Sequence, residues 1–170
     1  FAACVDPLDS RLLLSASPVG DETLVNSTTA EKQERPDVEY DSSGNYVVVW
    51  SSKGQDGDTA KESNIYFQRY HASATPQGTE TRVNTTITGN QNTPKVAVDA
   101  DGDFVVVWEG NGTQAGEIDA DGVFFQRFNS SGVAQGGETL VNTSTTGKQK
   151  NTSVVIDSDG DFVVVWEGAG

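Results

Sequence analysis

The chain has 170 residues and a formal net charge of −14, with 25 Asp and Glu against 11 Lys and Arg. So acidic a surface repels phosphate backbones, which argues against nucleic acid as a partner. No apolar run approaches the roughly 18 residues of a membrane-spanning helix, so no transmembrane segment is expected. Abundant Gly, Ser, Thr and Asn favour strands and turns over helices, which predicts an all-β protein.

Residues 1–21 form an N-terminal segment that precedes the first repeat. It contains Cys4, which has no second cysteine to pair with inside the chain. A leucine-rich stretch at 8–15 is predicted to form a strand that complements another part of the protein. Its candidate assembly residues are Leu8, Arg11, Leu12, Leu13 and Leu14.

A 58-residue unit then occurs almost three times, as repeat 1 (22–79), repeat 2 (80–137) and repeat 3 (138–170). Residues 80–112 and 138–170 share 21 of 33 positions without a gap, which identifies a true internal repeat. Each full unit holds four segments rich in β-branched and aromatic residues, and these predict four strands. In repeat 2 the predicted strands are residues 80–84, 95–99, 104–109 and 123–128.

The third predicted strand of each unit contains Val-Val-Val-Trp, a run that is apolar at every position instead of alternating. Both faces of this strand therefore need cover. Trp50, Trp108 and Trp166 occupy the same repeat position and are the expected core residues. The predicted fold is all-β, with tandem 58-residue, four-stranded sheets that resemble propeller blades. A β-sandwich and an open stack of sheets satisfy the same pattern and remain alternatives.

The two ends of the repeat array are in matching phase. Repeat 3 stops after its third predicted strand and lacks the fourth. At the same 58-residue offset, Arg11 aligns with Arg69, and residues 15–18 align with 73–76. We therefore expect strand 8–15 to fill the vacancy in repeat 3, within one chain or in the next subunit. The intermolecular version would propagate head to tail into a fibre. The alternative is that these residues are a fragment of a longer repeat protein.

Asp-Gly turns between the second and third predicted strands are candidate calcium sites. Calcium prefers six to eight oxygen ligands, and the D-x-D-G-D sequence gathers three carboxylates on one turn. The alternative is a hairpin turn whose acids are simply solvated. Repeat 1 keeps one carboxylate, Asp41, in the corresponding turn. The candidate ligands are Asp99, Asp101, Asp103, Asp157, Asp159 and Asp161.

No catalytic residues are predicted. His71 is the single histidine and has no partner that would suggest a triad. The sequence has no Gly-rich phosphate loop and no zinc-ligand spacing. Arg69 and Arg127 recur at one strand position, which structural repetition explains better than catalysis. We therefore expect no enzyme activity and no cofactor other than the candidate calcium.

Two sequence patterns resemble those of bacterial families. The sequence LDSRLLLSA at residues 8–16 resembles the N-terminal LEPR-x-LLS motif of planctomycete exported proteins. The pattern P-x-V-x-x-D-x-x-G-(D/N)-(F/Y)-V-V-V-W, followed by an aromatic-Gln-Arg-aromatic strand, is similar to repeats of large bacterial surface and adhesin-like proteins. These resemblances imply secretion and an extracellular or cell-surface location. The Asp-Gly turn before V-V-V-W also resembles sialidase-type propeller blades, from which no catalytic residue carries over.

The sequence therefore predicts a non-catalytic, extracellular structural repeat protein of the cell surface or matrix that assembles with copies of itself. The alternative is a propeller-like adhesin module that binds glycans or other surface proteins. Fibres in electron micrographs would favour the first function, and discrete particles the second.

Overall fold

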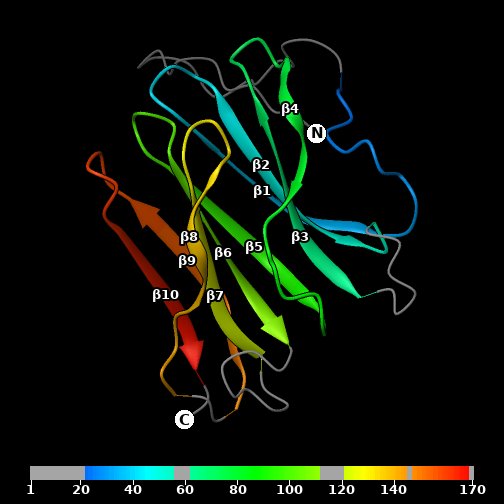
Figure 1. The fold of residues 1–170 in the computed structure, drawn as a ribbon, viewed down its shortest axis with the longest axis vertical. Coiled ribbons are helices and arrows are strands. Elements are labelled where there is room, and N and C mark those ends of the chain that lie inside the picture. The colour runs from blue at the N-terminus through cyan, green and yellow to red at the C-terminus, as the bar shows by residue number, and fades with distance from the viewer. Residues whose placement is uncertain (1–21, 56–61, 112–120, 145–146, 169–170) are drawn as a thin grey trace, which may run out of the picture.

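The computed structural model of the chain describes residues 22–55, 62–111, 121–144 and 147–168. These residues form ten strands in antiparallel sheets and no helix, which confirms the all-β prediction (Figure 1). The described part accordingly holds no helix that is long and apolar enough to cross a membrane. The strands make three sheets, which form an open row and do not close on themselves (Figure 1).

We name the sheets A, B and C in chain order. Within each sheet, every strand pairs antiparallel with the next strand along the chain. Sheet A contains β1 (Gln33–Tyr40), β2 (Tyr46–Lys53), β3 (Ser63–Tyr70) and β4 (Pro76–Arg82). Sheet B contains β5 (Gln91–Val98), β6 (Phe104–Asn111), β7 (Asp121–Phe128) and β8 (Ala134–Leu140). The described strands of sheet C are β9 (Gln149–Ile156) and β10 (Phe162–Gly168).

The sheets are out of phase with the repeats as the sequence suggested them. Residues 80–84, expected to open repeat 2, instead lie at the end of β4 and just beyond it, and β4 pairs backwards with β3. The reason is local: a short turn at 71–75 joins β3 to β4, and a short closed loop costs less entropy than a longer one. Each four-stranded sheet therefore ends with the strand that the sequence had placed at the start of the next unit.

Stacking of the sheets buries β6 on both faces, as its apolar sequence requires. Residues 104–108 are at most 1% exposed. Between sheets A and B, Val47 and Val49 pack with Val106 and Trp108. Figure 1 shows sheet A, coloured from blue through teal to green, on one side of sheet B and sheet C, in orange and red, on the other. The core between sheets B and C contains Ala97, Val105 and Val107, with Val154, Ile156, Phe162 and Val164 packed against them.

A tryptophan–glutamine hydrogen bond ties the central strand of sheets B and C to the first strand. Trp108 Nε1 donates to Gln91 Oε1 at 3.1 Å, and Trp166 Nε1 donates to Gln149 Oε1 at 3.0 Å. In sheet A the corresponding atoms, Trp50 Nε1 and Gln33 Oε1, are buried without a hydrogen-bond partner. Sheet A therefore differs from the other two at a buried polar pair.

The difference follows from one residue on the central strand. Sheets B and C have Gly110 and Gly168 beside the glutamine, where an added Cβ would lie 2.4 Å and 2.5 Å from the glutamine Oε1. Ser52 stands at this position in sheet A, and its side chain bonds to Gln55 instead. Because Ser52 carries the Cβ that the glycines lack, it occupies the space in which the carboxamide oxygen would meet the indole.

Trp166 departs from its predicted place in the core, since it remains 38% exposed while Trp50 and Trp108 are buried. In sheet B, Phe124 of β7 stacks on Trp108 with ring centroids 6.0 Å apart. No described strand occupies the corresponding place beside β10, so Trp166 has no such cover.

We predict that Gly110→Ala destabilises the fold by about 2 kcal/mol, because overpacked cores lose roughly 1–3 kcal/mol. The added Cβ would meet Gln91 Oε1 and also the Phe124 ring, 2.7 Å away. Gly137→Ala is the matched control, since a Cβ there meets nothing within 4 Å. Urea unfolding of both variants measures the effect, and equal midpoints would contradict this account of Ser52.

Candidate functional site

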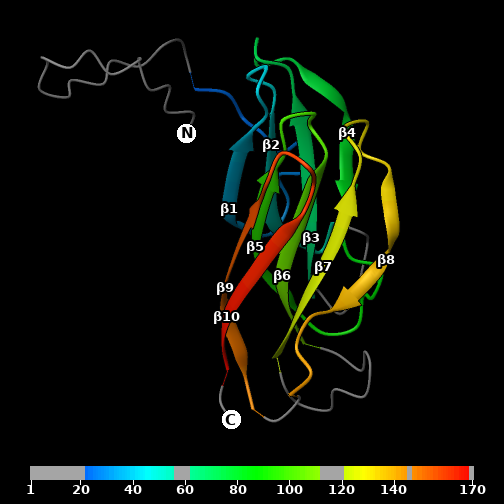
Figure 2. The ribbon, with the colours of Figure 1, turned by 90° about the vertical axis from the view of Figure 1, so that its left-hand side faces the viewer.

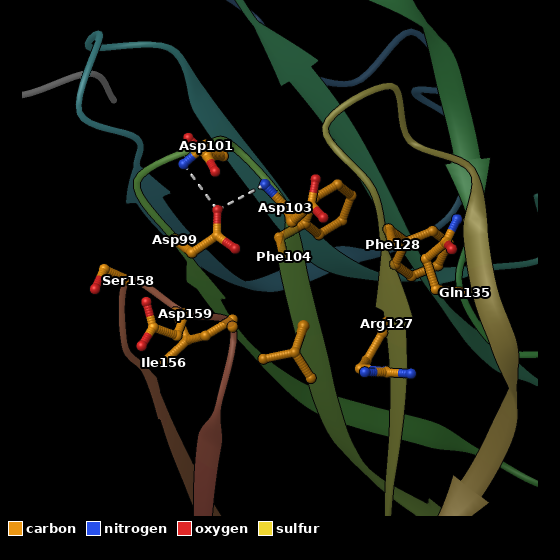
Figure 3. Close-up of a pocket in the computed structure, with 12 residues that line it drawn as sticks. Asp99, Asp101, Asp103, Phe104, Arg127, Phe128, Gln135, Ile156, Ser158 and Asp159 are labelled. Atoms are coloured by element: carbon orange, nitrogen blue, oxygen red, sulfur yellow. Dashed lines mark hydrogen bonds between the residues drawn. The ribbon is translucent and has the colours of Figure 1, made fainter.

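Four hairpin turns share one hydrogen-bond pattern, in which a side-chain oxygen accepts bonds from the backbone N–H groups two and four residues on. Asp99 Oδ1 accepts from the N–H groups of Asp101 and Asp103, both at 2.9 Å (Figure 3). These bonds give partners to backbone donors inside a tight turn. The same pattern occurs at Asp41, Asn129 and Asp157.

The six candidate calcium ligands lie in two of these turns, and the turns already use some of their oxygens. Besides the bonds to Asp99, Asp103 Oδ1 accepts from the Ser130 N–H at 2.7 Å. Within the described ranges, no three acidic, His or Cys side chains are placed to hold a metal ion together. Asn129 makes the same turn with an uncharged side chain, so this turn geometry needs no cation. Calcium binding stays a prediction.

Two equivalent cavities lie beside these turns, one between sheets A and B and one between sheets B and C. We call them the A/B cavity and the B/C cavity, and their volumes are about 210 Å³ and 330 Å³. Residues 58 positions apart in the sequence line the two cavities, so the same arrangement of side chains occurs at both sheet interfaces. Figure 3 shows the B/C cavity, whose lining includes Asp99, Phe104, Arg127, Phe128, Gln135 and Asp159.

Arg69 reaches from β3 across the A/B cavity to sheet B. Its Nη1 donates to the main-chain carbonyl of Ser130 in the β7–β8 turn, and it lies 3.4 Å from Gln77 Oε1. Gly132 of that turn gives the guanidinium room, because a Cβ there would be 2.8 Å from Arg69 Nε. Partial burial lowers the pKa of Arg69 from its ordinary value, yet arginine stays charged in proteins.

Arg127 is the equivalent of Arg69 in sheet B. The pairing is the same, since Val47 faces Arg69 in sheet A and Val105 faces Arg127 in sheet B. Arg127 is exposed, and no acceptor among the described residues takes a hydrogen bond from it. Ser130 lines the A/B cavity, and no residue in the described part of the chain takes its place in the B/C cavity.

Glutamates on the last strands of sheets A and B hold neighbouring loops in a second recurring contact. Glu138 Oε2 accepts from the Thr85 N–H at 2.6 Å and from the Thr85 hydroxyl at 2.8 Å. It also accepts from the N–H of Thr86. Glu80 accepts from the Ser27 N–H, so the loop before β1 is held on sheet A as the loop before β5 is held on sheet B.

Tyr70 anchors the segment before β1 on the outer face of sheet A. Its hydroxyl donates to the carbonyl of Val25 at 2.9 Å, and its ring stacks on Tyr46 with centroids 5.0 Å apart. Burial, together with the nearby Tyr46 and Glu80, raises the pKa of Tyr70 to about 12. The hydroxyl therefore stays protonated, and able to donate, well above neutral pH.

Sheet C has an unpaired edge and an uncovered face among the described residues. β2 and β6 each pair on both edges, whereas β10 pairs with β9 alone. On the outer face, Val155, Val163 and Val165 are 64%, 60% and 56% exposed. Apolar side chains of this size are normally covered when they cluster on a strand surface. Figure 2 shows β9 and β10 on the side of the molecule that faces the viewer, and among the described strands β10 pairs with β9 alone.

The predicted assembly strand 8–15, with Leu8, Arg11, Leu12, Leu13 and Leu14, lies outside the described residues. Sequence reasoning did not identify the contacts of Glu80 and Glu138, nor the two cavities. The available signal was the recurrence of glutamate, and of arginine at 69 and 127, at the 58-residue interval.

No family model matches this chain, and no curated protein matches it significantly.

We predict that Asp99→Asn leaves stability unchanged, because an amide oxygen accepts the same two backbone bonds, as Asn129 does. Asp99→Ala should cost about 1–3 kcal/mol, because it removes the acceptor of two partly buried backbone N–H groups. Urea unfolding with calcium and with a chelator measures both variants. A loss of stability in Asp99→Asn that appears only with calcium would instead show that the carboxylate binds the cation.

We predict that stability falls as the pH rises from about 10 to 12. The folded pKa of Tyr70, about 12, exceeds the ordinary value of 10.0, so its contribution is full below pH 10 and is lost through pH 12. Tyr70→Phe should reduce this fall, and Tyr40→Phe should not, because Tyr40 is 52% exposed. Unfolding midpoints across this pH range, with tyrosinate absorbance, test the assignment, and it is wrong if the two variants behave alike.

Proposed function

We propose that this chain is a non-catalytic structural repeat protein of an extracellular surface or matrix, and that it assembles with copies of itself. Its sheets act as blade-like units that stack through apolar faces. Copies join where an N-terminal segment adds strands to sheet C. The observation that carries this proposal is the free edge of β10.

The free edge supports strand addition through its backbone. In sheets A and B, the equivalent strand is central and has a hydrogen-bonded neighbour on each side. β10 has a neighbour on one side among the described residues, so the other side presents N–H and C=O groups that can pair with an added strand. Such β-augmentation joins chains through main-chain hydrogen bonds.

The outer face of sheet C supports the same proposal through its side chains. Val163 and Val165 correspond to Val105 and Val107, which are fully buried where sheet C covers sheet B. Burying the first pair in a similar way would stabilise an assembly by roughly 1.5 kcal/mol or more for each valine. A further sheet stacked on sheet C would supply that cover.

The segment 8–15 of a second copy is the proposed donor. Its phase in the 58-residue repeat places it, with the residues that follow, where sheets A and B have their third and fourth strands. The described chain begins at Glu22, and Val25 packs on the outer face of sheet A. Sheets A and C lie on opposite sides of sheet B (Figure 1), so the described residues around Val25 lie at the end of the row away from sheet C.

Three observations favour a structural function over catalysis. The aspartates of the D-x-D-G-D sequences cluster in two turns, in which Asp99 and Asp157 accept hydrogen bonds from backbone N–H groups. The two cavities are lined by equivalent residues. Such recurrence is expected where one unit packs repeatedly, whereas an active site need not occur in every unit. His71 is exposed in the β3–β4 turn.

We predict that deleting residues 1–17 abolishes assembly and leaves the fold intact, since the ten strands lie outside this segment. Sedimentation velocity and negative-stain electron microscopy of the full and truncated chains measure the effect. An oligomeric state that is unchanged by the deletion would contradict the proposal, and discrete particles that bind glycans would favour the adhesin alternative.

Substitutions on sheet C provide a second test of the proposed assembly, with a matched control. Val163→Lys with Val165→Lys places two charges on the proposed contact face and should cause the same loss of assembly. Ile87→Lys changes a residue of similar exposure, 48%, in the loop between β4 and β5, and should have no effect.

A further inference from the structure

The first strand of each sheet is an edge strand, and these edge strands lie beside one another. Among the described strands, β1, β5 and β9 each pair with a single neighbour in their own sheets, and they run along one side of the molecule (Figure 2). An edge strand presents N–H and C=O groups that can pair with a strand of another chain, which makes it a site of aggregation. The groups on these edges therefore need partners other than strands.

A carboxylate of sheet A binds an edge N–H of β5. The hydrogen bond from the Asp99 N–H to the Asp103 carbonyl closes the β5–β6 hairpin, so the N–H groups of alternate residues on β5 point away from β6. The N–H of Val96 is one of these, and it donates to Asp37 Oδ2 of β1 at 3.1 Å. The other oxygen of the carboxylate lies 3.2 Å from Lys95 Nζ.

A β-bulge and a second side chain of sheet A alter the rest of the β5 edge. The pairing of β5 with β6 shifts at Thr93 and Pro94, where Thr93 has φ at +52° and the proline has no N–H. On the other side of the bulge, the Ser51 hydroxyl of β2 donates to the Gln91 carbonyl at 3.1 Å, and both residues are buried. A strand from another chain would therefore meet an irregular edge on which a donor and an acceptor already have partners.

Repetition of the sequence does not by itself explain these contacts. At the interface between sheets B and C, Glu109 Oε1 accepts from the Asn151 N–H at 2.7 Å, in the corresponding bulge of β9. Glu109 is the equivalent of Ser51, whereas the equivalent of Asp37 in sheet B is Lys95. At both interfaces a carboxylate of one sheet thus binds an edge N–H of the next sheet, but it does so from different repeat positions.

We propose that Asp37, Ser51 and Glu109 prevent the edge strands of sheets B and C from pairing with strands of other chains. Each sheet does this for the first strand of the sheet that follows it. Carboxylates suit the purpose, because a charged acceptor makes a stronger hydrogen bond to an N–H than a neutral carbonyl of a competing strand does. The inference goes beyond the proposed assembly, since it concerns an association that the protein avoids.

Asp37→Ala and Glu34→Ala form a matched pair in the full chain, because each removes one carboxylate from β1. Asp37→Ala should speed amide hydrogen exchange at Val96 by about tenfold or more, the effect of losing a hydrogen bond to a charged acceptor. It should also self-associate more strongly than the wild-type chain in sedimentation velocity. Glu34→Ala should do neither, because Glu34 is exposed and makes no hydrogen bond or ion pair to another described residue.

Two further variants separate the edge N–H from the ion pair with Lys95. Asp37→Asn keeps a side-chain oxygen that accepts from the Val96 N–H but loses the charge, so it should associate less than Asp37→Ala. Lys95→Ala removes the ion pair and leaves the carboxylate on the N–H, so it should associate as the wild-type chain does. If Asp37→Asn associates as strongly as Asp37→Ala, the ion pair is what matters and the proposal is overturned.

The outcomes distinguish edge protection from assembly at sheet C. A monomeric wild-type chain contradicts assembly and leaves the comparison of variants intact. Unchanged exchange at Val96, or unchanged association, in Asp37→Ala overturns edge protection and leaves assembly standing. If the urea midpoint shows that Asp37→Ala does not fold, Glu109→Ala and Glu109→Gln decide: alanine should speed exchange at Asn151 and increase association more than glutamine, and equal effects overturn the proposal.

Discussion

The central strands of this protein carry apolar side chains on both faces, and an isolated antiparallel sheet cannot cover both. Residues 104–108 of β6 are at most 1% exposed because sheet A covers one face and sheet C covers the other. Stacking is therefore a condition of stability for each sheet. The same requirement explains why the sheets stack in a row. It also means that the exposed valines on the outer face of sheet C lack the cover that the equivalent valines of sheet B have.

Apolar stacking is not directional, so polar contacts between sheets set the register. Asp37 on β1 bonds to Lys95 Nζ at 3.2 Å and to the Val96 N–H at 3.1 Å on β5. Arg35 bonds to Thr93, and Arg69 to the Ser130 carbonyl. Exposed pairs of this kind each contribute little energy, yet together they disfavour alternative alignments of the sheets.

Much of the fold could be predicted from the sequence, because the 58-residue period and the V-V-V-W runs are strong local signals. The third and fourth predicted strands of repeat 2, residues 104–109 and 123–128, correspond closely to β6 and β7. The grouping of strands into sheets was harder. The composition of residues 80–84 does not show which strand they pair with. That pairing depends on the short turn at 71–75, which costs little entropy to close. Trp166 was misplaced for a related reason, since burial depends on a neighbouring strand and not on the residue itself.

Some features of the candidate site likewise follow from the sequence, and others from the tertiary structure alone. The sequence by itself determined the repeat, its all-β character, the recurring arginine and the matching phase of the two ends, because these depend on residue type and spacing. Only the tertiary structure decided that Arg69 binds a turn of the next sheet, that Arg127 finds no hydrogen-bond acceptor among the described residues, and that Ser52 separates Trp50 from Gln33. Each of these depends on which residues from distant parts of the chain meet at a sheet interface, and a linear pattern does not contain that information.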